Sequence, residues 1–259
     1  MVATPISDHE LFGLIGRRLG HSFSATFFNR YFEEHGVDAS YRLFELEDIS
    51  EFPALVDSLP SLAGLNVTIP YKESVIPYLH HLSDEARAVG AVNVVAFRHD
   101  ADGSVRLCGH NSDVYGFRRA LLEFCDGQLP SRALVLGSGG ASKAVGHVLA
   151  GLGVDVTVVS RTPVLPGQIS YDALTPDLWR DCGLIVNTTP LGMYPDVDTA
   201  PPLPWHLGGE RKLLFDLVYN PDVTRLMQIA SAAGAKVCNG LAMLRYQALE
   251  AYKIWKSQP

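Results

Sequence analysis

The sequence predicts an α/β fold made of two α/β domains. Two patterns favour this fold class: short apolar runs alternate with helical segments over the first hundred residues, and the same alternation begins again near residue 110. A third is a glycine-rich turn that follows an apolar strand at 133–136 and opens a helix. A chain of 259 residues is long enough for either one α/β domain or two smaller ones, and the restart favours two.

In the first part of the chain, short β-rich runs and helical patterns follow one another. In order, we expect a strand at 11–15, a helix at 25–34, a strand at 41–46, a helix at 51–58, a strand at 64–69, helical residues over 71–89 interrupted near Ser83, and a hairpin of 92–98 and 105–108 around the turn residues 100–103.

Lys72 follows the strand at 64–69 and has an unusual predicted position. Pro70 ends the strand, because proline cannot donate a hydrogen bond to a β-ladder, and it can open a helix. Lys72 would then lie in the first turn of that helix, where the partial positive charge disfavours a cation. Either it meets an anionic partner there or it is a solvated surface lysine, which is the commoner case.

The second part of the chain repeats the alternation. We expect a helix at 113–124, a strand at 133–136, a helix opened by 137–140, strands at 155–159, 184–187 and 213–217, a proline-rich loop at 195–204, and a final amphipathic helix at 241–255, long enough to pack across a domain junction.

Composition limits the possible partners and compartments. The sequence is 47% apolar and 19% charged, as in ordinary soluble globular proteins. Its net charge of −7 argues against nucleic acid as a partner, and no apolar stretch approaches the roughly 20 residues of a membrane span. The N-terminus lacks a secretory signal, and the four cysteines are widely spaced without zinc-ligand spacing. We therefore expect a cytoplasmic protein with reduced cysteines and no metal site.

The glycine turn predicts a dinucleotide site. Gly137, Gly139 and Gly140 permit close approach of a ligand, and the helix that follows presents unpaired amide groups to a pyrophosphate. The next strand ends in Ser160, Arg161 and Thr162. An arginine in place of an acidic residue there suits a 2′-phosphate, so NADP is favoured over NAD, although Arg161 also fits a surface ion pair.

With these motifs in order, the chain closely resembles the shikimate dehydrogenase family over nearly its whole length. The matching blocks are HSFS at 21–24, GLNVTIPYK at 64–72, GAVN at 90–93, GHNSDVYG at 109–116, GSGGA at 137–141, SRT at 160–162, NTTPLGM at 187–193, FDLVYNP at 215–221 and NGLAMLRYQALEA at 239–251. Each block is a weak to moderate signal alone, whereas their shared order and spacing are specific.

The resemblance implies reversible NADPH-dependent reduction of 3-dehydroshikimate to shikimate, on the route to chorismate and the aromatic amino acids. It implies a substrate-binding domain at 1–112 and 240–259 and a Rossmann-type NADP-binding domain at 113–239, with the C-terminal helix returning to the first domain. Lys72 takes the family's acid/base role, and Asp113 orients the substrate hydroxyl and holds Lys72 in place. A small-molecule substrate is the expected partner, and the protein is expected to be a monomer or a homodimer.

The resemblance also implies the remaining site residues. Ser22, Ser24 and Tyr219 match residues at the substrate carboxylate, although serines near a helix start more often serve as caps. Thr68, Asn93 and Gln247 match residues that bind ring hydroxyls. The residues matched to the cofactor are Gly137, Ser138, Gly139, Gly140, Ala141, Ser160, Arg161, Thr162, Leu217 and Gly240.

Some positions depart from the family pattern, and other functions stay open. Arg18 and Ala25 stand where the family commonly has proline, and Leu165 replaces a basic residue, which weakens the expected preference for NADP. Arg17 and Arg18 either change the loop before His21, add positive charge near an anionic ligand, or are solvated. The alternative functions are a quinate or dual quinate/shikimate dehydrogenase, and a non-catalytic regulatory protein on the same scaffold.

Overall fold

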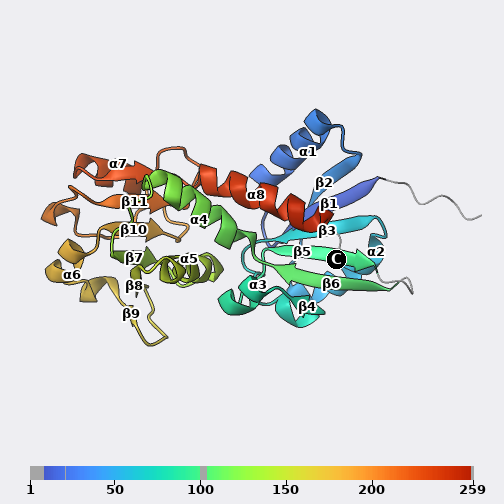
Figure 1. Ribbon diagram of the computed structural model, residues 1–259, viewed down its shortest axis with the longest axis horizontal. Coiled ribbons are helices and arrows are strands. Elements are labelled where there is room, and N and C mark those ends of the chain that lie inside the picture. Colours follow the sequence, from blue (N-terminus) through green and yellow to red (C-terminus); the bar gives the residue numbers. More distant parts are fainter. Residues whose placement is uncertain (1–8, 21, 100–103, 258–259) are drawn as a thin grey trace, which may run out of the picture. The chain divides into compact units, whose positions relative to one another are not determined.

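The structure is a computed structural model, and it describes residues 9–20, 22–99 and 104–257. The chain divides into two compact units, one formed by residues 1–112 and 248–259 and the other by residues 113–247. Each unit contains one six-stranded sheet, so the predicted α/β class is confirmed (Figure 1). In the described part of the chain, none of the helices combines the length and apolar character that crossing a membrane requires.

The sheet of the first unit is mixed, with strand order β2-β1-β3-β5-β6-β4. Its strands are β1 (Glu10–Gly16), β2 (Ala39–Glu45), β3 (Leu62–Val67), β4 (His81–Leu82), β5 (Val94–His99) and β6 (Val105–His110). Strand β1 runs parallel to β2 and β3, whereas β5 runs antiparallel to β3 and β6 as the predicted hairpin requires. The predicted turn at 100–103 lies outside the described residues.

The helices of this unit cover both faces of its sheet. They are α1 (Phe23–His35), α2 (Phe52–Ser58), α3 (Asp84–Val89), the 3-10 helices Ile49–Glu51 and Ile76–Tyr78, and the C-terminal part of α8 (Leu241–Lys256). Phe28 and Phe32 bury one side of α1 against β1, while Leu65 and Phe52 belong to the cluster on the opposite face. Ser83 caps α3 as predicted, with its hydroxyl accepting a hydrogen bond from the Ala86 amide.

Trp255 fixes the end of α8 on the first unit. Its indole stacks on Phe12 with ring centroids 4.7 Å apart and donates a hydrogen bond of 3.2 Å to the Val95 carbonyl. Gly64 makes room for this ring, because a Cβ there would overlap the Trp255 side chain. Arg98 donates to the carbonyls at the C-terminal end of the helix, including that of Ile254 at 2.6 Å. The predicted return of the C-terminal helix to the first unit is therefore confirmed.

The sheet of the second unit is entirely parallel, with strand order β12-β11-β10-β7-β8-β9. The strands are β7 (Arg132–Leu136), β8 (Asp155–Val159), β9 (Gln168–Ile169), β10 (Leu184–Asn187), β11 (Leu213–Asp216) and β12 (Lys236–Cys238). The helices are α4 (Ser112–Phe124), α5 (Gly140–Gly151), α6 (Pro176–Asp181), α7 (Arg225–Ala232), the 3-10 helices Tyr171–Ala173 and Trp205–Leu207, and the first part of α8.

The strand order of this sheet reverses between β7 and β10. The chain first extends the sheet through β8 and β9, and then returns to the other side of β7 to add β10, β11 and β12. In open parallel sheets, ligands bind at such a reversal, outside the carboxyl ends of the two strands. Here these ends are Leu136 and Asn187, next to the glycine turn.

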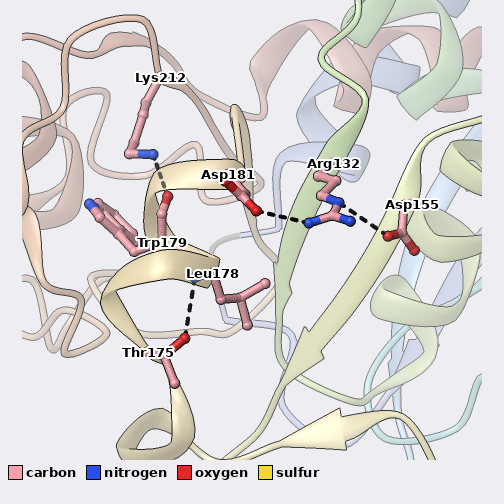
Figure 2. A network of polar contacts seen from close by, with 7 residues as sticks. All are labelled: Arg132, Asp155, Thr175, Leu178, Trp179, Asp181 and Lys212. Carbon is pink, nitrogen blue, oxygen red and sulfur yellow. Dashed lines mark hydrogen bonds and ion pairs between the residues drawn. The ribbon is translucent and has the colours of Figure 1, made fainter.

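A buried lysine caps the C-terminal end of α6 in the second unit. The Lys212 ammonium donates to the carbonyl oxygens of Trp179 at 2.6 Å and Cys182 at 2.8 Å, and it lies 4.7 Å from the centre of the Trp179 ring (Figure 2). The side chain of Thr175 caps the other end of the helix by accepting a hydrogen bond from Leu178. A cation at the last carbonyls suits the negative end of the helix dipole.

Candidate functional site

Lys72 lies in a turn after β3, so the predicted helix over 71–89 is wrong for its first part. The Lys72 carbonyl accepts a 2.7 Å hydrogen bond from the Val92 amide, and the Ile76 amide pairs with Glu73 rather than with Lys72. Helical structure there is limited to a 3-10 turn, Ile76–Tyr78, followed by the short strand β4 and then α3. Lys72 is half-buried. The sequence predicted that Lys72 lies at an unfavourable helix start, but in the structure no helix begins there.

Tyr71 anchors the turn that carries Lys72. Its ring is buried, its hydroxyl donates a 2.6 Å hydrogen bond to the Leu46 carbonyl, and its amide donates to the Thr68 carbonyl at 2.9 Å. The Arg17 guanidinium lies 5.9 Å from the centre of the Tyr71 ring, and interactions with Tyr71 raise the pKa of Arg17. Arg17 therefore interacts with the residue next to Lys72, a contact that the sequence left open.

Backbone hydrogen bonds bring Thr68 and Asn93 to the same edge of the first sheet as Lys72. Thr68 donates its amide to Ile15 at 2.9 Å, and the Asn93 carbonyl accepts from the Val67 amide at 2.9 Å. The Asn93 side chain is buried and accepts a 2.7 Å hydrogen bond from the Ser112 amide. Thr68, Lys72 and Asn93 are thus held by one network within the first unit.

Ser22 and Ser24 lie at the start of α1. Ser22 is the N-cap of the helix, and its hydroxyl accepts a hydrogen bond of 3.3 Å from the Ser24 amide. The capping alternative is therefore confirmed for Ser22. Ser24 follows in the first turn of the helix and is half-buried. His21, which belongs to the same sequence block, lies outside the described residues.

Asp113, Tyr219 and Gln247 belong to the second unit. Asp113 is buried in the first turn of α4, where the helix dipole favours a carboxylate. Gln247 lies half-buried on α8, opposite Gly116 of α4. A Cβ at Gly116 would lie 2.8 Å from Cβ of Gln247, so this glycine lets α4 and α8 approach closely. Tyr219 is half-buried in the loop after β11.

The glycine turn has the geometry of a phosphate-binding loop. Gly137 has φ +105°, and a Cβ there would lie 2.7 Å from the Thr188 hydroxyl, so both conformation and space require glycine. Gly139 is the N-cap of α5 and has no side chain to occupy the first-turn amides. The Ser142 hydroxyl steadies the turn by donating to the Gly137 carbonyl at 2.7 Å. The amides of Gly140 and Ala141 at this helix start suit an anionic group.

The end of β8 lies beside this turn. The Ser160 hydroxyl is 3.4 Å from that of Ser138 and accepts a 3.2 Å hydrogen bond from the Thr162 amide. Arg161 is exposed. Burial raises the pKa of Tyr171, and the positive charge of Arg161 acts in the opposite direction. The structure therefore brings together the glycine turn and the predicted phosphate-binding segment.

Leu217 and Gly240, the other predicted cofactor residues, are direct neighbours. The Gly240 amide donates to the Val218 carbonyl at 3.1 Å, and a Cβ at Gly240 would overlap the Leu217 carbonyl. Glycine is thus required where the chain enters α8.

Asp216 organises the loops after β10 and β11, a role that was not expected from the sequence. Its carboxylate accepts hydrogen bonds from the Asn187 amide group at 2.9 Å, the Thr224 hydroxyl at 2.7 Å and the Val218 amide at 3.1 Å. Burial raises the pKa of Asp216, and these hydrogen bonds act to lower it. Asn187 therefore has a structural role in these loops. The sequence signal that could have identified Asp216 was an acidic residue at the end of an apolar strand.

Metal ligation has no support in the described residues, where no three His, Cys, Asp or Glu side chains are grouped to hold an ion. The cysteines of the chain are all free thiols, and Cys125 and Cys182 are buried.

Comparison with known proteins identifies relatives along the whole chain. Residues 14–95 match the family described as the shikimate dehydrogenase substrate binding domain. A shikimate dehydrogenase (NADP(+)) of Clostridium beijerinckii is 36% identical over 95% of this chain and 92% of its own length. Among solved structures, shikimate 5-dehydrogenase of Thermus thermophilus in complex with NADP(H) and shikimate is 34% identical, with a TM-score of 0.80 over 95% of this chain and 93% of that one.

A quinate dehydrogenase of Corynebacterium glutamicum in complex with NAD is also similar in structure. It is 26% identical, with a TM-score of 0.82 over 95% of this chain and 93% of that one. Identity is higher with the shikimate dehydrogenases, and the matched relatives extend across both units. The chain therefore belongs to the shikimate dehydrogenase family.

Proposed function

We propose that this protein is an NADP-dependent shikimate dehydrogenase, which reversibly reduces 3-dehydroshikimate to shikimate in the synthesis of chorismate and the aromatic amino acids. The observation that carries the proposal is the likeness, over 95% of the chain, to a solved relative in complex with both NADP(H) and shikimate. The expected partner is accordingly a small molecule. We further propose a cytoplasmic protein that is a monomer or a homodimer.

We propose that the two units bind different ligands. The first unit binds the substrate, a proposal supported by the match of residues 14–95 to a substrate binding domain. The second unit binds NADP, supported by its parallel sheet, its strand-order reversal and the glycine turn at that reversal. We propose that the substrate-binding domain comprises 1–112 and 240–259 and the cofactor-binding domain 113–239, so that residues 240–247 of the second compact unit belong to the substrate-binding domain.

Lys72 is the proposed acid/base residue. Reduction of a ring ketone needs a hydride, which NADPH supplies when bound, and a proton for the oxygen. The Lys72 ammonium donates that proton, and its amine takes a proton back in the reverse reaction. This role is supported by the hydrogen bonds of the Tyr71 hydroxyl to Leu46 and of the Lys72 carbonyl to Val92, which hold the turn that carries the side chain. Asp113 binds the same hydroxyl and orients it for transfer.

The remaining substrate contacts follow from donor chemistry. Ser22, Ser24 and Tyr219 carry hydroxyls, which can donate to the substrate carboxylate. Thr68, Asn93 and Gln247 are proposed to bind ring hydroxyls, since each can donate or accept. Capping by Ser22 is compatible with binding because a hydroxyl has one proton and two lone pairs.

The cofactor residues fit NADP. The turn Gly137, Ser138, Gly139, Gly140 and Ala141 suits the pyrophosphate, since a Cβ at Gly139 would project into open space in the part of the chain that the structure describes. The residues at the end of β8 suit the 2′-phosphate, and those in the loop after β11 and at the entry to α8 line the site. They are Ser160, Arg161, Thr162, Leu217 and Gly240.

A spectrophotometric assay tests the function. Oxidation of shikimate and of quinate is followed at equal concentrations, first with NADP and then with NAD. We expect shikimate and NADP to give the highest kcat/KM. A preference for quinate, which the quinate dehydrogenase relative makes the second candidate, would reassign the substrate. Binding of shikimate without turnover would instead indicate a regulatory protein.

A further inference from the structure

A buried tyrosine links the elements that carry the proposed substrate residues of the first unit. Tyr41, on β2, is 3% exposed, and its hydroxyl donates a 2.8 Å hydrogen bond to Oδ1 of Asn66 on β3. Asn66 is 6% exposed, and its Nδ2 donates to the Asn93 carbonyl at 3.2 Å. Strand β1 lies between β2 and β3, so the Tyr41 hydroxyl bridges strands that do not pair with each other.

The donors and acceptors of this chain have a single consistent order. The Asn93 carbonyl can only accept, so the amide nitrogen of Asn66 faces it and the amide oxygen faces Tyr41. The Tyr41 hydroxyl has a single proton, which it donates in its hydrogen bond to the amide oxygen of Asn66. The chain of donors runs from Tyr41 through Asn66 to the Asn93 backbone.

Helix α1 is fastened to the same tyrosine. Asn29, one turn after Ser24, accepts from the Tyr41 amide at 2.8 Å and donates to the Tyr41 carbonyl at 3.0 Å. The ring of Phe28 stacks on the Tyr41 ring, with centroids 4.7 Å apart and planes inclined by 13°. The position of α1, and with it the position of Ser24, relative to β2 is thus set by backbone and ring contacts at Tyr41.

We propose that Tyr41 is a positioning residue for substrate binding, which holds Ser24 on α1 in a fixed relation to Asn66 and to the backbone of Asn93. The proposal rests on the function proposed above, because Ser24 and Asn93 contact the substrate only if that function holds. It assigns to Tyr41 no contact with substrate or cofactor. Its effect is preorganisation: two groups that must bind one rigid ring are already at the required separation.

The effect should be independent of pH near neutrality. Burial raises the pKa of Tyr41 well above its usual value, more than the interaction with Ser24 lowers it. The hydroxyl thus keeps the proton that it donates to Asn66.

The variant Tyr41→Phe removes the hydroxyl and keeps the ring. We expect KM for shikimate to rise about 3- to 10-fold, as loss of one net hydrogen bond implies, with kcat within about twofold of wild type. KM for NADP should not change, and the shikimate effect should be constant between about pH 6 and 9, since Tyr41 stays protonated. The matched control is Tyr252→Phe, in the same aromatic cluster, which should leave both KM values unchanged.

Two further variants separate positioning from general stability. Asn29→Ala, at an exposed position, loosens α1 without opening the core, and we expect it to raise KM for shikimate about 2- to 5-fold. Tyr41→Phe added to Ser24→Ala should change KM less than it does in wild type, because the two residues act as a unit. Asn29→Ala keeps the test valid even if Tyr41→Phe folds poorly, because it leaves Tyr41 in place.

The outcomes are distinguishable from failure of the proposed function. If wild type oxidises shikimate while Tyr41→Phe and Asn29→Ala both keep its KM, the positioning role is wrong and the function stands. Additive effects of Tyr41→Phe and Ser24→Ala would likewise contradict it. If wild type has no activity on shikimate, the proposed function itself fails.

Discussion

At the scale of single residues, the position of Lys72 is set by its neighbours' backbone hydrogen bonds. Its carbonyl is paired with Val92, and the preceding Tyr71 is fastened to Leu46. The side chain is therefore presented from a rigid turn rather than from a helix start. The proton transfer that we propose for Lys72 needs such fixed placement, because small displacements from the reacting atom are costly in rate.

Replacement of Lys72 by alanine tests the acid/base role. We expect kcat to fall about 100- to 10,000-fold, while the affinity for shikimate changes much less, since the proton is needed in the transition state rather than for binding. Stopped-flow turnover and calorimetric binding of shikimate measure the two quantities. Ser74→Ala, in the same exposed turn, is the control and should have wild-type kcat. Near-wild-type turnover of Lys72→Ala would show that another group moves the proton.

Arg161 provides the corresponding test for the cofactor. The variant Arg161→Ala should raise KM for NADP about 10-fold, because it removes a charged donor to the 2′-phosphate, and leave KM for NAD almost unchanged. Initial rates with each cofactor measure the split. Arg180→Ala, which removes an exposed arginine paired with Asp177, should change neither value. An equal effect of Arg161→Ala on both cofactors would mean that this side chain does not bind the phosphate.

At the scale of elements, the link between β7 and α5 contains one position where the fold requires glycine and one where it does not. Gly137 has a positive φ and contacts Thr188, whereas Gly139 has φ −84° and a conformation that other residues adopt readily. The fold therefore does not require glycine at position 139. A bound pyrophosphate does, because the backbone must approach it closely.

Gly139→Ala separates those two requirements. Without cofactor, its free energy of unfolding in urea should stay within about 0.5 kcal/mol of wild type. KM for NADP should rise about 5- to 100-fold, the cost of forcing a methyl group into a filled site. Gly146→Ala, within α5, is the control: alanine favours the helix by up to about 1 kcal/mol, and KM should not change. Normal NADP binding by Gly139→Ala would place the pyrophosphate elsewhere.

At the scale of the whole molecule, global stability depends on buried polar groups such as Lys212. Burial lowers the pKa of Lys212 from its usual value of 10.5. The neighbouring surface carries ion pairs of Arg132 with Asp181 and Asp155, at 3.0 Å and 3.5 Å (Figure 2). Exposed pairs of this kind contribute about 0 to 1 kcal/mol each, so the buried lysine matters more.

Lys212→Met should lower the free energy of unfolding by about 1 to 3 kcal/mol, because the Trp179 and Cys182 carbonyls lose their donor. Urea unfolding measures the loss. Lys236→Met, which removes an exposed lysine that also donates to a carbonyl, is the control and should cost less. Equal losses in the two variants would mean that burial of Lys212 is unimportant.

The stability difference between wild type and Lys212→Met should depend on pH in a defined window. Between the lowered pKa and 10.5, the unfolded chain binds a proton that the folded chain has released. The free energy of unfolding of wild type therefore rises with pH in that window, relative to the variant. Below the window the lysine is charged in both states, and the difference should be flat. A flat difference at alkaline pH as well would contradict the lowered pKa.

The sequence predicted well the elements whose periodicity extends over a full helix or strand. Strands β1, β7, β8 and β10 and the long helix α8 were all expected within one or two residues. The short strands β4, β9 and β12 were missed, because two or three residues are too few to show alternation. The predicted helix beginning near residue 71 failed because the Lys72 carbonyl pairs with the distant Val92 amide, and most of the hydrogen bonds that follow join residues three apart, as in a 3-10 helix.

The sequence alone determined the α/β class, the order of the motif blocks and the family, since these depend on local periodicity and on residue types at fixed spacings. The tertiary structure decided how Lys72 is held, why Gly64 and Gly240 must be glycine, and how Tyr41 connects Asn29, Asn66 and the Asn93 backbone. These features join residues twelve or more positions apart. Such contacts form only when strands and helices pack, and no local pattern in the chain specifies them.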